Sequence, residues 1–207
     1  MEFPESIYRN ISKEFALLFL EKGEILFRPL AFYRAMEDPK RRDPNEGSVE
    51  AKFYHGTAKL IGKGATEESR PIVITEGTLN LTLEAPDQIY VACFSTREQK
   101  KFGEATIVIR DTNTFLRTIT GFLEAIKLQM FAGTVEYYDR ENVDLIGSQT
   151  KLGFMKSNDF SDEQEFRLAF RLPADHQFKS RLEQLSINER MLIFGVGDLS
   201  HVAKIEL

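Results

Sequence analysis

The sequence predicts a single α+β domain that spans residues 1–207. Apolar residues alternate with polar ones, or run uninterrupted, in several short segments along the whole chain, which is typical of β-strands. Two other segments repeat apolar residues at helical spacing. No internal repeat, low-complexity tract or linker divides the chain, and 207 residues suffice for one large domain with a substantial core.

The chain is expected to begin with a strand, a helix and a second extended segment. Residues 5–10 resemble a short strand, and residues 13–22 carry apolar side chains at helical spacing. Ser12 precedes the helix as a candidate N-cap, and Gly23 follows it as a natural stop. Residues 24–34 are interpreted as extended, with a break at the proline.

The rest of the chain continues in the same style. The most apolar strand, residues 88–94, is expected at the centre of the sheet. A helix with a clean apolar stripe follows Asp111 or Thr112, and another is expected over residues 175–190. The remaining predicted strands cover residues 51–62, 71–86 (one or two strands), 104–111, 133–139, 191–197 and 201–207, and the predicted loops cover 36–50, 62–71 and 139–150.

Composition limits the partners and the compartment. A net charge of -5 argues against a broad, non-specific nucleic-acid surface but leaves room for a local basic groove. The single cysteine, Cys93, excludes an internal disulfide and a cysteine-built zinc site, and suits a reducing compartment. The first residues have no apolar core of a signal peptide, and no apolar run approaches membrane-spanning length. We therefore expect a cytoplasmic protein without a membrane segment.

Residues 156–171 are the most informative stretch, because a polar loop there leads into an alternating strand. Residues two apart share a face of a strand, so Glu163 and Glu165 are expected to point the same way, together with Arg167. The apolar residues between them would face the core. Nothing nearby in the sequence neutralises both acids, and a solvated strand end is the alternative interpretation.

Two further polar positions stand at predicted strand ends. Arg9 precedes the first helix and is either a solvated end or an anion ligand, and Ser95 and Thr96 end the central strand, where they also suit a turn cap. No phosphate-binding loop, nucleophile elbow or His/Cys metal cluster is present in the sequence. Cys93 is expected to be an inert core thiol, and His55 a core or surface residue rather than a metal ligand.

The order of these residues resembles a known signature. Arg9, then Ser95-Thr96, then Glu163-x-Glu165 is similar to the arginine–serine–glutamate pattern of the ADP-ribosyltransferase superfamily. Its opening, Tyr8-Arg9 on a strand followed by a helix and a strand, resembles the toxin branch that modifies nucleic acids.

A second resemblance covers more of the chain. The segments IYRNIS, ILFRPLAFYRAMED with RDPNEG, VACFST, GTVEYYD and KSNDFSDEQEFR are similar to successive blocks of a large, poorly characterised bacterial family. The last block of that family has a lysine, three residues, an aromatic residue and then Glu-x-Glu-x-Arg. The matching positions here are Lys156, Phe160, Glu163, Glu165 and Arg167.

The transferase resemblance implies NAD as co-substrate. Arg9, with Tyr8 beside it, would hold the diphosphate or the nicotinamide ribose, because a guanidinium suits charge-assisted bonds to phosphate. Ser95 and Thr96 would brace the catalytic acid and the nicotinamide ribose, and Phe94 completes the implied cofactor-binding set.

The same resemblance implies a role for each acid. Glu165 would bind the ribose hydroxyl and stabilise the positive charge that develops as nicotinamide leaves, while Glu163 would orient or deprotonate the acceptor. Phe160 and Arg167 would contact the acceptor, since an aromatic ring suits a flat base. The implied fold is two packed mixed β-sheets around a cleft with flanking helices.

The favoured function is an NAD-dependent ADP-ribosyltransferase, a bacterial toxin or phage-defence effector that modifies a base of RNA or DNA, with a cognate antitoxin as partner. One alternative is a nucleotide-binding module on the same fold that turns nothing over. The other is a magnesium-dependent nuclease that uses Glu163, Glu165 and the Asp38/Asp43 loop, whereas the transferase needs no metal.

Overall fold

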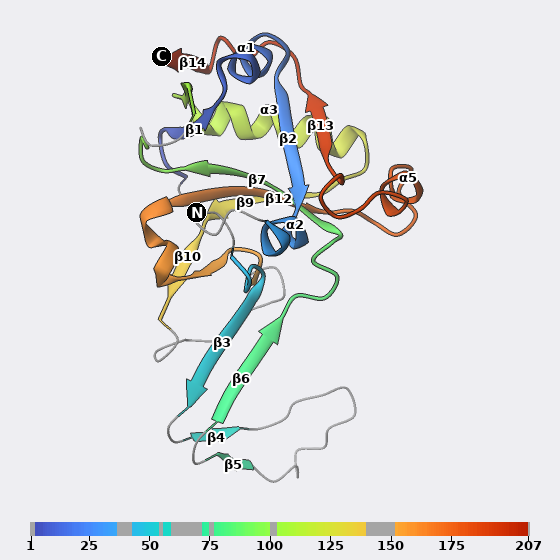
Figure 1. Cartoon of the computed structure of the whole chain (residues 1–207). Coiled ribbons are helices and arrows are strands. Elements are labelled where there is room, and N and C mark those ends of the chain that lie inside the picture. Colours follow the sequence, from blue (N-terminus) through green and yellow to red (C-terminus); the bar gives the residue numbers. More distant parts are fainter. Residues whose placement is uncertain are drawn as a thin grey trace.

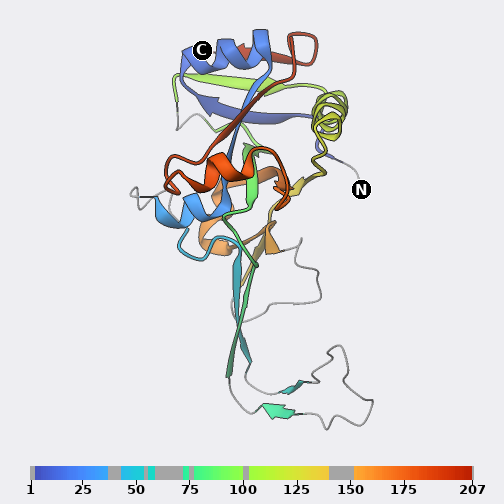
Figure 2. The ribbon, with the colours of Figure 1, turned by 90° about the vertical axis from the view of Figure 1, so that its right-hand side faces the viewer.

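The computed structural model has an α+β architecture, in which a large antiparallel sheet carries helices on its faces and a two-stranded ribbon projects from the body (Figures 1 and 2). It describes residues 3–36, 43–53, 56–58, 72–74, 77–99, 103–139 and 152–206. The predicted loop over 62–71 falls outside these residues, as do His55, Asp38 and, apart from Asp139, the predicted loop over 139–150. No helix of the described residues is long and apolar enough to cross a membrane.

The elements follow one another in mixed order, as expected for an α+β chain. Their bounds are β1 (Ile7–Ile11), α1 (Lys13–Lys22), β2 (Glu24–Pro29), α2 (Leu30–Ala35), β3 (Ser48–Phe53), β4 (Gly56–Ala58), β5 (Ile72–Ile74), β6 (Gly77–Thr82), β7 (Ile89–Ser95), β8 (Ala105–Ile109), α3 (Thr112–Ala125), β9 (Met130–Thr134), β10 (Glu136–Tyr138), β11 (Met155–Ser157), the 3₁₀ helix η1 (Asn158–Glu163), β12 (Glu165–Arg171), α5 (Lys179–Glu183), β13 (Leu192–Gly195) and β14 (Ala203–Glu206).

Helix α1 has the predicted ends, and helix α3 is capped by Asp111. The Ser12 hydroxyl accepts a hydrogen bond from the Phe15 amide at the start of α1, and Gly23 closes it with a left-handed φ of 63°. At α3 the Asp111 carboxylate accepts from the Thr114 amide at 2.9 Å, so Asp111 rather than Thr112 is the N-cap.

Three predictions of secondary structure are wrong. The strand predicted over residues 133–139 divides at Val135 into the end of β9 and the whole of β10, which belong to different sheets. Residues 24–34 are predicted to be extended, but the strand ends at Pro29 and α2 begins at Leu30. The Ala31 amide in the first turn of α2, which has no partner within the helix, donates to the Pro86 carbonyl at 3.2 Å. The predicted helix over 175–190 contains only α5, because the Ser186 hydroxyl and amide bind the Glu189 carboxylate at 2.6 and 3.0 Å. That local turn competes with a continuing helix.

The central strand of the large sheet is β7, as predicted from its apolar composition. The order is β13-β2-β7-β1-β8-β14, and β12 pairs with both β7 and β9. Every described pair in this sheet is antiparallel, and β10–β11 is the parallel pair of the described chain. The expectation of mixed sheets is therefore wrong for this sheet, which is antiparallel in every described pair. An alternating strand reads the same in either direction, so residue pattern alone does not give strand direction.

The two edges of β7 are paired differently. Along one edge β12 pairs with β7 over the whole length of β7, from Ile89↔Arg171 to Ser95↔Glu165. Along the other edge the sheet divides. On the dividing edge β2 reaches only Tyr90 and Val91, and β1 reaches only Ser95. Strands β2 and β1 thus leave from opposite ends of β7, and the described chain has no ladder partner between them.

Both faces of the β7–β12 pair are covered. On one face Phe94, Phe166 and Phe170 pack with α1 and α3 in the main core. On the other face a smaller cluster includes Leu30 and Val91. The expectation that the aromatic residues of β12 face the core is confirmed, and the opposite face of β12 is buried as well.

Strands β3 and β6 form the projecting ribbon, with pairs from Ser48↔Thr82 to Phe53↔Gly77 (Figures 1 and 2). At its base Gly47 has a φ of +70°, and a Cβ there would lie 2.9 Å from Leu83 Cδ1. Glycine is therefore required where the loop 43–47 turns into the ribbon.

Candidate functional site

The two glutamates meet through a turn, not through strand alternation. Glu163 ends η1, Gln164 has a left-handed φ of 46°, and Glu165 begins β12. Both carboxylates nevertheless reach the Lys156 ammonium, at 2.6 Å from Glu163 and 3.2 Å from Glu165. The prediction that the two acids converge is confirmed, but the geometry that brings them together differs from the predicted one.

The end of β7 holds this turn by its backbone. The Gln164 carbonyl accepts from the Thr96 amide at 2.7 Å and the Thr96 hydroxyl at 3.1 Å, and the Ser95 hydroxyl lies 3.0 Å from the Glu163 carbonyl. Gln99 donates to the same Glu163 carbonyl at 2.5 Å. Ser95 and Thr96 therefore brace the segment that carries both acids, whereas the sequence analysis expected them to brace the acid itself.

Glu165 is a buried carboxylate, 5% exposed, with two cationic neighbours. Its Oε1 accepts from Arg167 Nε at 2.5 Å, and its Oε2 accepts from Arg167 Nη2 at 3.1 Å. Lys156 supplies the second positive charge. The expectations of a solvated strand end, and of acids that nothing local neutralises, are both wrong. Lys156 comes from β11 and thus from outside the strand on which those expectations rested.

A third acid, Glu46, completes the cluster from the loop before β3. Its Oε1 lies 2.6 Å from Arg167 Nη1, its Oε2 lies 3.0 Å from Arg167 Nη2, and Arg167 Nη1 also donates to the Gly153 carbonyl at 2.7 Å. Arginine has five N–H donors, and the bonds to Glu165, Glu46 and Gly153 occupy all five. Arg167, expected to contact the acceptor, is instead a buried residue whose donors are all directed into the protein.

The cluster has an excess of negative charge. Three carboxylates, Glu46, Glu163 and Glu165, surround the two cations Lys156 and Arg167. We refer to these five residues as the charged cluster. The carboxyl of Asp43 interacts electrostatically with Glu46, Lys156 and Arg167. Burial raises the pKa of Asp43, and the charge of Glu46 reinforces this shift.

The pKa values of the two glutamates move in opposite directions. Burial by itself would raise the pKa of Glu165, but Arg167 and Lys156 outweigh it and hold that pKa well below its usual range. Burial raises the pKa of Glu163, with Lys156 opposing and Glu165 and Glu46 reinforcing the shift. Divergent pKa values in a pair of neighbouring acids are typical of sites where one stays ionised and the other exchanges protons.

Two aromatic residues lie against the charged cluster. The Lys156 ammonium lies 4.9 Å from the centre of the Phe160 ring. The Tyr137 hydroxyl accepts from the Glu165 amide at 2.8 Å, and burial raises the pKa of Tyr137 to about 12. Glu163, with its side chain 37% exposed, is the acid of the charged cluster that faces solvent.

Arg9 lies where the sheet divides. From β1 its guanidinium stacks 5.2 Å from the Phe94 ring centre, and its Nη2 donates to the Leu26 carbonyl of β2 at 3.4 Å. Burial lowers the pKa of Arg9, and in the described part of the chain no carboxylate lies within ion-pair distance of it. This half-buried cation therefore keeps donors for an anion.

Tyr33 and Cys93 connect Arg9 to the acids. The Cys93 thiol lies 3.7 Å from the Tyr33 hydroxyl. The charges of Glu165 and Arg9 shift the pKa of Tyr33 in opposite directions, upwards and downwards respectively. Burial, reinforced by Glu165, raises the pKa of Cys93 far above neutrality. The thiol therefore stays protonated, as expected of an inert core cysteine.

Strand register brings the three segments of the predicted motif side by side, and the β1 residue of the row is Tyr8, the neighbour of Arg9. Tyr8 of β1 lies opposite Ser95 of β7, and Ser95 lies opposite Glu165 of β12. Sequence reasoning missed Glu46, Tyr137, Tyr33 and Gln99 as site residues, and cited Lys156 only for the family resemblance. For Glu46, Tyr137, Tyr33 and Lys156 the only available signal was membership of the family-like blocks, because the contacts join segments far apart in the chain. Gln99 lies outside those blocks.

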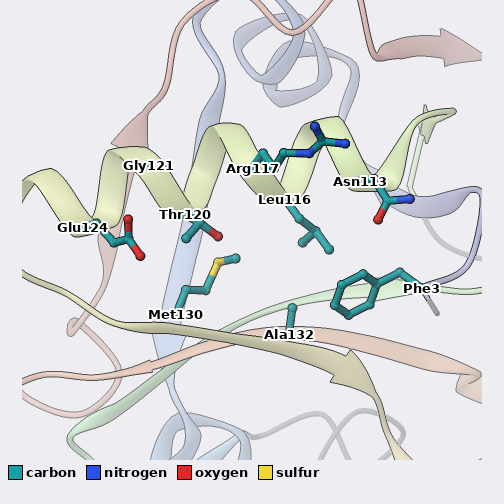
Figure 3. A pocket seen from close by; sticks show the side chains of 9 residues that line it. All are labelled: Phe3, Asn113, Leu116, Arg117, Thr120, Gly121, Glu124, Met130 and Ala132. Carbon is teal, nitrogen blue, oxygen red and sulfur yellow. The ribbon is translucent and has the colours of Figure 1, made fainter. Parts of the chain in front are cut away.

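A hollow of about 410 Å³ lies elsewhere, between α3 and β9 (Figure 3). Met130 and Ala132 of β9 form its floor and pair with Phe170 and Leu168, on the core side of β12. The charged cluster is on the opposite face of that strand. The hollow therefore belongs to a different surface of the molecule. Its remaining lining residues are Phe3, Asn113, Leu116, Arg117, Thr120, Gly121 and Glu124.

Comparisons with known proteins give no relative. No family model, no curated protein and no solved structure matches the chain. Among the residues that the structure describes, no group of three or more His, Cys, Asp or Glu side chains is arranged to hold a metal ion.

Proposed function

We propose that this chain is an NAD-dependent ADP-ribosyltransferase, a toxin or phage-defence effector that transfers ADP-ribose to a base of RNA or DNA. The observation that carries the proposal is the register that aligns Tyr8, Ser95 and Glu165 across β1, β7 and β12. Three segments far apart in the sequence, which carry Arg9, Ser95 and Glu165, are thereby neighbours in one sheet, and this supports the arginine–serine–glutamate resemblance.

Arg9 supports NAD as the co-substrate. A half-buried guanidinium without a carboxylate partner in the described chain suits a diphosphate, which offers several charged oxygens at hydrogen-bond distance. Phe94 holds the guanidinium from one side, and Tyr8 lies next to it on β1. In this proposal the division of the sheet around β7 corresponds to the cleft between two packed sheets that the resemblance implies.

Glu165 has the electrostatic properties that the reaction needs. The N-glycosidic bond of NAD breaks with its electron pair leaving on nicotinamide, and positive charge develops on the ribose. A carboxylate that stays ionised at all physiological pH values stabilises that charge, and the excess of negative charge in the charged cluster adds to the effect. Lys156 and Arg167 keep the carboxylate charged and fixed.

Glu163 is assigned to the acceptor. As the nucleophilic atom of the acceptor forms its bond to the ribose carbon, its proton passes to the Glu163 carboxylate, whose raised pKa and solvent exposure suit a general base. Phe160 and Tyr137, next to Lys156 and Glu165, offer aromatic surfaces for a flat base. We keep a cognate antitoxin as the expected partner and the cytoplasm as the expected compartment.

The structure favours neither alternative function. In a magnesium-dependent nuclease a divalent cation would have to compete with Lys156 and Arg167 for the three acids, whereas the proposed transferase uses the acids with these two cations in place. A binding module without turnover would not need two neighbouring acids with opposite pKa shifts.

The test is release of nicotinamide from NAD, with and without total cellular RNA, DNA or protein. We expect Glu165→Gln to reduce release by about a hundredfold or more, as loss of a charge-stabilising group does. Glu183→Gln is the matched control, because this acid is 56% exposed on α5 and pairs with Lys179 at 3.4 Å. Absence of release by the wild type in every condition, or equal rates for the wild type and Glu165→Gln, would overturn the proposal.

A further inference from the structure

Glu46 has no role in the signature that suggested the transferase, yet it is as buried as any residue of the charged cluster. It is 1% exposed and comes from a loop 121 positions before Arg167. Its two carboxylate oxygens each accept a bond from Arg167, at 2.6 and 3.0 Å, and its Oε2 also lies 3.7 Å from Lys156. One side chain thus contacts both cations that hold Glu165.

The contacts of Arg167 explain what Glu46 does to Glu165. Arg167 is planar, and its donors point in fixed directions. Glu46 and the Gly153 carbonyl occupy three of its five donors, and the two that remain, on Nε and Nη2, bind the two oxygens of Glu165. Because Glu46 and the Gly153 carbonyl fix the orientation of the guanidinium, the carboxylate of Glu165 has a single orientation in which both of its oxygens accept hydrogen bonds from Arg167.

The position of Glu46 is itself fixed. Its carbonyl accepts from Arg34 Nε at 2.5 Å, and its amide donates to the Asp43 carbonyl at 3.1 Å. Gly47, which follows, requires a left-handed backbone at the base of the β3–β6 ribbon. The loop 43–47 therefore presents Glu46 as a rigid element.

We propose that Glu46 is a positioning residue for the transferase, which fixes Arg167 and through it the carboxylate of Glu165. This inference rests on the proposed function. Buried ion clusters are often no more stabilising than apolar residues of the same volume, because burial costs offset the attraction between the charges. A structural role alone thus gives a weak reason for a third buried acid at this place.

Glu46 also acts on Glu163, which gives a signal separate from stability. The groups that face Glu163 are Lys156 of β11, Glu165 of β12, Tyr137 of β10 and Glu46 itself. Glu46 raises the pKa of Glu163, whereas Lys156 lowers it. Removing the charge of Glu46 therefore lowers the pKa of Glu163, and its carboxyl loses its proton at lower pH. If Glu163 is the general base, the acid limb of the pH–rate profile moves to lower pH in step.

The experiment compares Glu46→Gln with Glu183→Gln. The control makes the same change of acid to amide at a residue of α5 that is 56% exposed, pairs with Lys179 and lies outside the charged cluster. Nicotinamide release is measured as kcat and KM from pH 5 to 9 with the acceptor pool that gives the highest wild-type rate. Thermal unfolding confirms that both variants are folded.

We expect Glu46→Gln to lower kcat by about 10- to 100-fold, with a much smaller change in KM for NAD, and to move the acid limb to lower pH. We expect Glu183→Gln to keep the wild-type kcat and profile. An active wild type with the same kcat and profile in Glu46→Gln as in Glu183→Gln would overturn the positioning role and leave the transferase standing. A wild type that releases no nicotinamide would instead overturn both.

Discussion

Ser95 lies directly opposite Glu165 in the β7–β12 ladder, yet its hydroxyl binds the carbonyl of Glu163 and not the carboxylate of Glu165. The serine of the signature thus shapes the turn that carries the two acids. The Gln164 backbone between them has a left-handed conformation that non-glycine residues adopt at a cost of about 1–2 kcal/mol. Hydrogen bonds from the end of β7 to that turn offset this cost and fix the spacing of the acids.

The two arginines of the site should respond oppositely to replacement by methionine. Arg167→Met removes the hydrogen-bonded cation of two buried acids and leaves Glu46 and Glu165 with Lys156 alone, so we expect the free energy of unfolding to fall by about 3–5 kcal/mol. Arg9→Met removes a half-buried cation that has no acid partner in the described chain, so stability should stay within about 1 kcal/mol or rise, while KM for NAD increases.

Urea unfolding of both variants checks this contrast. Arg171→Met serves as control for the first, because Arg171 is exposed on the same strand. A large loss of stability in Arg9→Met would mean that Arg9 is a structural residue and not a ligand for an anion.

The fold class and most elements could be predicted from the sequence, because apolar alternation and helix caps are local. The burial of Glu165 could not be predicted, since the cation that pairs with it beside Arg167 is Lys156 on another strand, and Glu46 reaches them from 121 positions before Arg167. The division of the sheet around β7 depends on ladder registers, which the residue pattern of one strand does not encode.

Stability should depend on Glu165 in acid. Its folded-state pKa lies below that of an unfolded chain, about 4.3 for glutamate, so its contribution is complete above that value and is lost as pH falls towards the folded pKa. We expect wild-type stability to decline from about pH 5 downwards, and the slope to be smaller in Glu165→Gln. Urea unfolding between pH 7 and 2.5 measures both slopes. Equal slopes would show that the stability of the fold does not depend on the ionisation of Glu165.

The Tyr137 hydroxyl is expected to stabilise the start of β12. It accepts from the Glu165 amide at 2.8 Å, so Tyr137→Phe leaves that amide without its partner and should cost about 1–3 kcal/mol. Tyr90→Phe is the matched control, because the ring of Tyr90 contributes mainly by stacking on Phe170. Chemical denaturation measures both, and a loss in Tyr137→Phe no larger than in the control would contradict the assigned bond.

Two glycines should respond to alanine with opposite signs. Gly47 has a φ of +70°, and a Cβ there meets Leu83 at 2.9 Å, so Gly47→Ala should destabilise by about 1–2 kcal/mol. Gly121 lies within α3 with nothing within 4 Å of the position of a Cβ, so Gly121→Ala should stabilise by about 1 kcal/mol through helix propensity. Because Gly47 follows Glu46, its substitution should also lower nicotinamide release, whereas Gly121→Ala should not. Thermal unfolding and the release assay on both variants test this pair, and unchanged release in a destabilised Gly47→Ala would argue that the loop does not control the charged cluster.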